Sequence, residues 1–265
     1  MGTEIIMIKY HLIEIYVFFL GMCVGSFMNV CIYRLPNAKS IVRPRSMCPK
    51  CGNPIRFYDN IPLFSYLWLR GRCRHCNTSI SFRYPMVEVM AGFFALIVYL
   101  WFGITLKAFV YYAFIATLLV ITFIDIDHYI IPDVITLPGI PICFLASFAL
   151  PTVTYKDALL GILAGGGSLF AVAWIYHLLT GKEGMGGGDI KLLSMIGALL
   201  GWKGVFFTIF VSSAFGTLIG SAVMLYTRKD RKLAVPFGPF LAMGAIVYVF
   251  FGSEILYWYI NFIRS

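Results

Sequence analysis

The chain has 265 residues, of which 60% are hydrophobic and only 12% are charged. A soluble domain carries about a quarter charged residues, so this composition excludes an ordinary soluble enzyme and makes lipid the main solvent. The formal net charge of +9 does not by itself indicate nucleic acid, because basic residues of membrane proteins set their topology. We therefore expect an all-α polytopic membrane protein that binds no nucleic acid.

Apolar segments long enough to cross a bilayer recur along the chain. The first is longer than the apolar core of a cleaved signal peptide, so we expect it to be retained. We predict about eight transmembrane helices, with seven as the alternative because the sixth segment is short. The expected spans are 12–33, 86–104, 107–124, 134–150, 158–179, 190–202, 204–226 and 237–258.

Lysine and arginine are divided unequally between alternate connections of these spans. One set of connections holds the segment 34–83, Lys182, Lys191 and the basic cluster at 228–232. The positive-inside rule places this set in the cytoplasm and both termini outside. The spread over several connections also argues against a nucleic-acid site. The other set holds Lys9, Lys107, Lys156, Lys203 and Arg264.

One extramembrane segment is large enough to fold separately. We predict a first transmembrane helix at 1–33, a small cytoplasmic domain at 34–85 and a transmembrane core at 86–265. The middle part is proline-rich, which favours turns, and it is too short to bury much core. It therefore needs covalent cross-links or a bound metal ion to stabilise its fold.

Two C-x-x-C pairs in this segment, with 21 residues between them, could provide such stabilisation. The pattern is typical of tetrahedral zinc with two thiolate ligands from each pair. His75 is an alternative ligand, and two disulfides are an alternative cross-link that a reducing cytoplasm disfavours. Four thiolates complete the tetrahedral coordination shell and leave no position for water, so we expect a structural zinc ion. The predicted ligands are Cys48, Cys51, Cys73 and Cys76.

Aspartates at the ends of two predicted spans are candidates for catalysis. Asp125 and Asp127 end the third span, and Asp189 begins the sixth on the same face, so two carboxylates lie at matching depth. A close pair shares one proton, so one member activates water while the other protonates the leaving group. The glycines at 186–188 leave room for an extended substrate. The alternatives are an interfacial loop with a helix cap at Asp133, and a glycine-rich turn capped by Asp189.

Small residues at four-residue spacing predict close helix packing within several spans. These pairs are Gly21 and Gly25, Gly161 and Gly165, and Gly216 and Gly220.

Eight short motifs follow one another in order along nearly the whole chain. They are G-S-F-M-N-V at 25–30, R-L-P at 34–36, R-S-M-C-P-K-C at 45–51, N-I-P at 60–62, R-G-R-C-R-H-C at 70–76, R-Y-P-M-V-E at 83–88, D-I-D with I-P-D at 125–133, and G-G-G-D-I-K at 186–191. In this order they resemble the bacterial type IV prepilin peptidases, a branch of the G-x-G-D membrane aspartyl proteases.

The resemblance implies cleavage of the basic leader of prepilins or pseudopilins, the substrates of type IV pilus and type II secretion systems. The cut follows a glycine at the cytoplasmic face of the bacterial inner membrane. The family pattern assigns catalysis to Asp125 and Asp189. It implies supporting roles for Asp127, Gly186, Gly188 and Lys191.

Family members with the four-cysteine domain also N-methylate the new terminus with S-adenosylmethionine, and this chain is expected to do the same. Glu88 and the cysteine domain are the candidates for methyl transfer. Three alternatives stay open. They are a peptidase without transferase activity, an ion-coupled transporter that uses the same aspartates, and a non-catalytic assembly factor.

Overall fold

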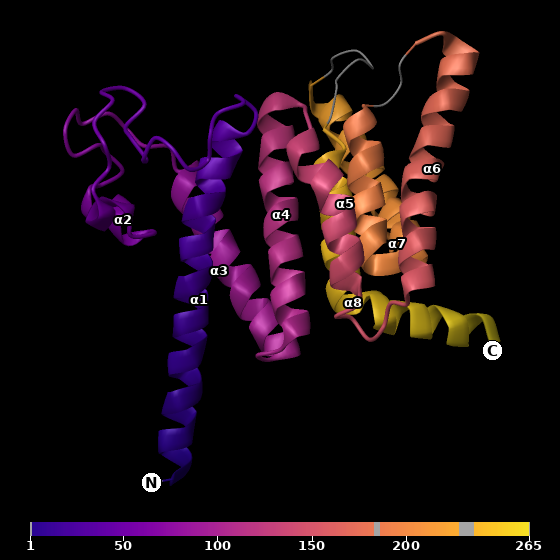
Figure 1. Cartoon of the computed structure of the whole chain (residues 1–265), viewed down its shortest axis with the longest axis horizontal. Coiled ribbons are helices and arrows are strands. Elements are labelled where there is room, and N and C mark those ends of the chain that lie inside the picture. Colours follow the sequence, from indigo (N-terminus) through magenta and orange to yellow (C-terminus); the bar gives the residue numbers. More distant parts are fainter. Residues whose placement is uncertain (1, 183–185, 228–235, 265) are drawn as a thin grey trace. The chain divides into compact units, whose positions relative to one another are not determined.

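The computed structural model describes residues 2–182, 186–227 and 236–264, so the basic cluster at 228–232 lies outside the described residues. Its elements, shown in Figure 1, are α1 (Gly2–Arg34), η1 (Phe57–Asn60), α2 (Phe64–Trp68), α3 (Arg83–Phe102), α4 (Leu106–His128), α5 (Asp133–Ser147), α6 (Tyr155–Thr180), α7 (Gly187–Thr227) and α8 (Gly238–Arg264). These described ranges contain no β-strand, only two isolated bridges. The predicted all-helical class is confirmed for this part of the chain.

Five helices are long and apolar enough to cross a membrane, so the chain is a multi-pass membrane protein. They cover His11–Arg34, Arg83–Phe102, Leu106–His128, Tyr155–Thr180 and Gly187–Ala222. Two further apolar helices are shorter, at Asp133–Ser147 and Gly238–Gly252. The count of eight spans stays a prediction.

Helix α7 contains 41 residues, about twice the length that one span needs. Gly201 interrupts it with φ 72° and ψ 177°, a conformation that glycine adopts without a Cβ penalty. The interruption divides α7 into 187–200 and 202–227, close to the predicted spans 190–202 and 204–226.

The chain forms two compact units, Met1–Ala116 and Thr117–Ser265, with the boundary inside α4. In the first unit α1 packs closely on α3. A Cβ added at Gly25 would lie 2.6 Å from Glu88 Cα, so only glycine permits this approach. The Asn29 amide donates to the Tyr84 carbonyl at 3.0 Å and joins the same two helices.

The first half of α7 lies at the centre of the second unit, packed against α5, α6 and α8. Its side chains Leu192, Leu193, Met195 and Ile196 are almost completely buried. Helix α6 approaches so closely that the backbones of Gly161 and Gly197 meet.

Two of the three predicted glycine pairs therefore lie at close helix contacts. Gly21 and Gly25 face α3, and Gly161 and Gly165 face α7. The third prediction is wrong. Among the described residues, a Cβ at Gly216 would meet nothing closer than 3.8 Å, and one at Gly220 would meet nothing within 4 Å.

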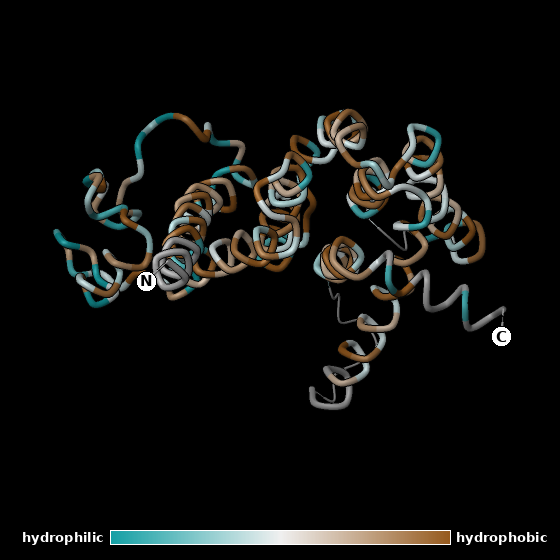
Figure 2. The backbone as a smooth tube through the Cα atoms, turned by 90° about the horizontal axis from the view of Figure 1, so that it is seen from below, coloured by the Kyte–Doolittle hydropathy of each residue, from teal (hydrophilic) through white to brown (hydrophobic). Residues whose placement is uncertain are grey.

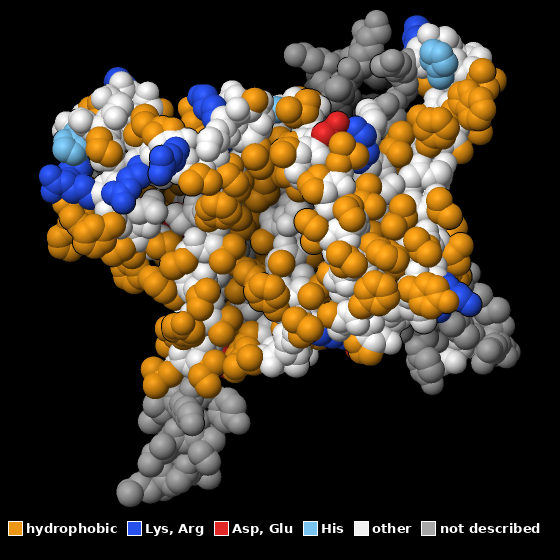
Figure 3. Space-filling model, viewed as in Figure 1, with side chains coloured by type: hydrophobic (Ala, Val, Ile, Leu, Met, Phe, Trp, Pro, Cys, Tyr) orange, Lys and Arg blue, Asp and Glu red, His pale blue; other side chains and the backbone are white. Residues whose placement is uncertain are grey.

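The surface agrees with a lipid environment. Hydrophobic residues follow the helices in Figure 2. The face in Figure 3 is covered by hydrophobic side chains over the helices, whereas Lys and Arg gather over the connection between α1 and α3.

Candidate active site and metal centre

Asp125 lies in the last turns of α4, in the second unit, and is only 5% exposed. Its Oδ2 accepts a hydrogen bond from the backbone N–H of Gly238 at 3.0 Å. Gly238 begins α8, where the first N–H groups of a helix have no partner within the helix. The start of α8 therefore holds one oxygen of the Asp125 carboxylate.

Asp189 lies in the first turn of α7, and its carboxylate interacts electrostatically with that of Asp125. Ile131 lies next to both Gly188, which precedes Asp189, and Gly238, which contacts Asp125. A Cβ at Gly188 would lie 2.8 Å from Ile131 Cβ, and one at Gly238 would lie 3.2 Å from Ile131 Cδ1. The ends of α4 and the starts of α7 and α8 thus converge, with two carboxylates at the meeting point.

Asp127 is exposed, whereas Asp125 is buried. Two residues correspond to about 200° of helix rotation, so the two side chains face nearly opposite directions on α4. Of the two, Asp125 is the one that accepts from Gly238, and the secondary role of Asp127 stays a prediction.

Asp133 does not cap α5, because Pro132 occupies the N-cap position and Asp133 lies in the first turn. Its two carboxylate oxygens instead accept from the Lys191 ammonium at 2.7 and 2.8 Å. The pair joins α5 to α7 two residues after Asp189. Gly186 lies just before α7, and a Cβ there would meet nothing within 4 Å.

Gly238 is the site residue that the sequence analysis missed. It follows Asp125 by more than a hundred positions, and a hydrogen bond from a backbone N–H requires no particular side chain, so no sequence motif marks it. The available signal was the run Pro236-Phe237-Gly238-Pro239, because glycine and proline together mark a helix start.

The four cysteines lie in two turns with the same backbone pattern. Cys48 N–H donates to Asn53 and Gly52 N–H donates back to Cys48, and the corresponding bonds recur between Cys73, Thr78 and Asn77. The bridge that closes each turn is also equivalent, Met47 with Pro54 and Arg72 with Ser79. Gly52 and Asn77 both have positive φ, which these residue types tolerate best. We call the two turns knuckle 1 (46–55) and knuckle 2 (71–80).

The thiols fit a tetrahedral zinc ion. Zinc–sulfur bonds of about 2.3 Å place the sulfurs of a tetrahedron about 3.8 Å apart. The Sγ atoms of Cys48 and Cys76 are 3.8 Å apart, and the four Sγ atoms of Cys48, Cys51, Cys73 and Cys76 lie within 4.8 Å of one another. The cluster could hold zinc, and all seven cysteines of the chain are free thiols in the structure, so the disulfide alternative finds no support.

The pKa is lowered at two of the four thiols, and the largest cause at each is a backbone N–H group. Hydrogen bonds from the backbone of Cys51 and Lys50 lower the pKa of Cys48. A backbone hydrogen bond from Thr78 lowers the pKa of Cys76 to about 6. Thiolate is the form that binds metal, so each knuckle contributes one sulfur prepared as a ligand.

Glu88 lies in α3 and is 9% exposed. Its Oε2 accepts from the backbone N–H of Leu63 at 2.9 Å, and the Ser26 side chain is its second hydrogen-bond partner. The carboxylate therefore joins α1, α3 and the segment before α2. It is not part of the cysteine cluster.

Two family models match the chain. Residues 19–102 match a bacterial peptidase A24 N-terminal domain, and residues 112–221 match the type IV leader peptidase family. Curated relatives named prepilin leader peptidase/N-methyltransferase include one from Pseudomonas putida, 37% identical over 89% of this chain and 90% of the relative. Another, from Stutzerimonas stutzeri, is 38% identical over 92% of this chain and 93% of the relative. No solved structure matches significantly. The chain belongs to the type IV leader peptidase family.

Proposed function

We propose that this chain removes the leader peptide of type IV prepilins or pseudopilins and N-methylates the terminus that cleavage exposes. The names of its relatives support both activities. Family membership favours this function over the ion-coupled transporter. The observation that carries the peptidase proposal is the convergence of Asp125 and Asp189 where α4 ends and α7 begins.

The carboxylate pair has the chemistry that peptide hydrolysis needs. When two carboxylates lie close together, one keeps a proton while the other is ionised. The ionised member takes a proton from water, and the water oxygen attacks the carbonyl carbon of the glycine that precedes the cut. The protonated member gives its proton to the leaving nitrogen, so the C–N bond breaks and the pair ends with one proton. The Gly238 N–H holds Asp125 in place during these steps.

The site is suited to a substrate that is itself in the membrane. Both aspartates lie at helix ends, and Gly186–Gly188 precede Asp189 without side chains that would block an extended peptide. Basic residues of the segment 34–83 support placing this end of the helices in the cytoplasm. We assign the active site to the cytoplasmic face of the bacterial inner membrane.

For the second activity, S-adenosylmethionine would supply the methyl group, and the terminal amine must lose a proton to accept it. Zinc at the four thiolates would have no open position, so its role is structural and no step passes through it.

The peptidase assignment is tested with the purified full chain and a prepilin peptide. Asp125→Asn and Asp189→Asn keep the shape of each side chain but remove its acid–base function, so each is expected to lower the cleavage rate at least about a thousandfold. Asp127→Asn, the matched control two residues along α4, is expected to stay within about tenfold of the parent. Cleavage that survives either substitution would exclude the aspartyl mechanism.

A further inference from the structure

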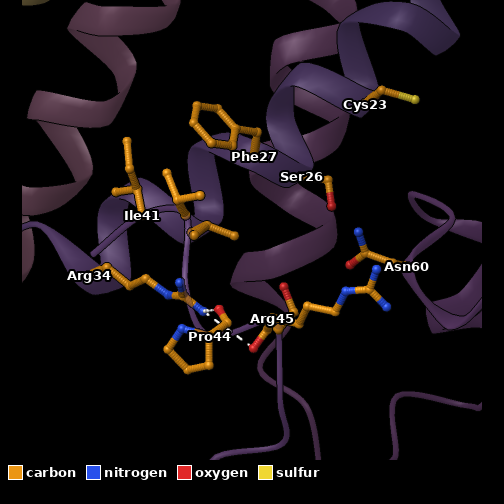
Figure 4. Close-up of a pocket in the computed structure, with 11 residues that line it drawn as sticks. Cys23, Ser26, Phe27, Arg34, Ile41, Pro44, Arg45 and Asn60 are labelled. Carbon is orange, nitrogen blue, oxygen red and sulfur yellow. Dashed lines mark hydrogen bonds between the residues drawn. The ribbon is translucent and has the colours of Figure 1, made fainter. Parts of the chain in front are cut away.

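A pocket of about 310 Å³ lies in the first unit beside the end of α1, and neither Asp125 nor Asp189 lines it. Figure 4 shows that its lining has two sides. Phe27 and Ile41 lie on one side, and the exposed Val42, next to Ile41 in the chain, also lines the pocket. Ser26, Arg45 and Asn60 lie on the other, with the Arg45 side chain extended toward Asn60.

The wall that carries Arg45 is built by a second arginine. The Arg34 guanidinium is buried and donates to the carbonyls of Ser40 at 2.8 Å and Pro44 at 2.7 Å. Arg34 is therefore occupied in shaping the loop. Among the residues that the structure describes, the Arg45 guanidinium has no hydrogen-bond or ion-pair partner, so it is available to an anionic group.

The polar side, which carries Ser26 and Asn60 as well as Arg45, is fixed from behind by Glu88. Its carboxylate interacts with Ser26 of α1 and accepts from the backbone of Leu63, three residues after Asn60. Leu63 has φ 60°, a costly conformation for a non-glycine residue, and such strain clusters at functional sites. The buried acid thus sets the spacing between Ser26 and Asn60 on the polar side of the pocket.

We infer that this pocket binds the methyl donor S-adenosylmethionine, with its carboxylate against Arg45 and Asn60 and its adenine against Phe27, Ile41 and Val42. The assignment rests on the proposed N-methyltransferase function. A donor with a flat heteroaromatic base at one end and a charged amino-acid group at the other matches a lining that is apolar on one side and polar on the other. One free guanidinium suits a single carboxylate and is a poor match for a polyphosphate.

Direct binding tests the assignment without any turnover. The probe is S-adenosylhomocysteine, titrated calorimetrically into the zinc-loaded full chain in detergent. Arg45→Ala and Phe27→Ala, one from each wall, are each expected to weaken binding at least about tenfold. Arg45→Lys should recover part of the lost affinity, because it restores the charge but not the planar guanidinium that can donate two hydrogen bonds to one carboxylate. Zinc content, measured in every variant, reports whether the knuckles are folded.

Arg43→Ala is the matched control, because it removes the same charge from the same loop at a position that does not line the pocket. Its affinity is expected to equal that of the parent. If Arg45→Ala and Phe27→Ala bind as tightly as the parent, or if Arg43→Ala weakens binding equally, the pocket assignment is overturned. If the parent itself neither binds the probe nor transfers a labelled methyl group, the methyltransferase part of the proposed function fails instead.

Discussion

Lys191 shows how a residue outside the carboxylate pair can influence it. Its ammonium contacts both oxygens of Asp133, but the side chains are 35% and 56% exposed. An exposed pair of this kind contributes about 0.2–1 kcal/mol to stability. Its larger effect is positional, because it fixes the first turn of α7, which carries Asp189, against the start of α5.

We predict that Lys191→Met and Asp133→Asn each lower the cleavage rate by up to about tenfold, and that the double variant is no slower than either single one. The physical reason is that both substitutions break the same contact, so their effects are not additive. Lys182→Met, which removes an exposed lysine after the end of α6, serves as the control. Additive losses in this cycle of rate measurements would show that the two residues act separately.

At the scale of single residues, sequence predicted the buried and half-buried carboxylates that the structure brings together but not their backbone partners. Asp125 and Asp189 were predicted from depth and motif, because a carboxylate at the membrane boundary is costly and conspicuous. The Gly238 N–H was not, because any residue except proline supplies this donor. The role of Lys191 as the partner of Asp133 depends on how α5 meets α7, which neither local sequence encodes.

At the scale of helices, close backbone packing determines which helices associate. At Gly25 of α1 and at Gly161 of α6 the neighbouring backbone occupies the space that a Cβ would need. In a bilayer the association of helices depends on such contacts, because lipid provides no hydrophobic driving force between them. The α1–α3 contact also carries Glu88, and hence one wall of the proposed methyl-donor pocket.

We predict that Gly25→Ala destabilises the protein by about 1–3 kcal/mol, because the added methyl group forces α1 away from α3. Gly220→Ala is the matched control. It adds the same atom to a helix where nothing lies within 4 Å, so it should be neutral or slightly stabilising through its helix propensity. Thermal unfolding in detergent measures both. An equal response of the two variants would contradict the close-contact explanation.

The same glycines show the limit of spacing as a signal. A four-residue period identifies residues on one face of a helix but does not say whether another helix covers that face. A Cβ at Gly216 would meet only the Phe237 and Phe240 side chains, at 3.8–3.9 Å, and among the described residues nothing lies within 4 Å of one at Gly220. The break of α7 at Gly201 was anticipated within two residues, because the apolar run is too long for one span, but its φ angle follows from packing against α6.

On the scale of the whole chain, the two proposed activities belong to different units. Asp125, Asp189 and Gly238 lie within Thr117–Ser265, whereas the cysteine knuckles and the pocket lie within Met1–Ala116. Ser46 of knuckle 1 lines the pocket and accepts the hydrogen bond from Ile55 that closes the knuckle. Zinc held by the knuckles would therefore stabilise one wall of the pocket.

We predict that removing zinc with a chelator lowers affinity for S-adenosylhomocysteine at least about tenfold but changes leader cleavage by less than about tenfold. Restoring zinc should restore binding. Calorimetry and peptide cleavage on one preparation compare the two effects. A parallel loss of both would contradict the separation of the two activities.

The equivalence of the two knuckles has a consequence for how the metal is captured. Each knuckle closes through hydrogen bonds between residues fewer than ten positions apart, so each forms without the other and offers a ready-made dithiol. A zinc ion bound here would join two bidentate chelators on one tether, so its affinity would depend on the effective concentration of one knuckle near the other. That concentration falls only slowly as a tether lengthens. Metal exchange with an outside thiol can accordingly proceed one knuckle at a time, through a half-bound ion that never leaves the chain.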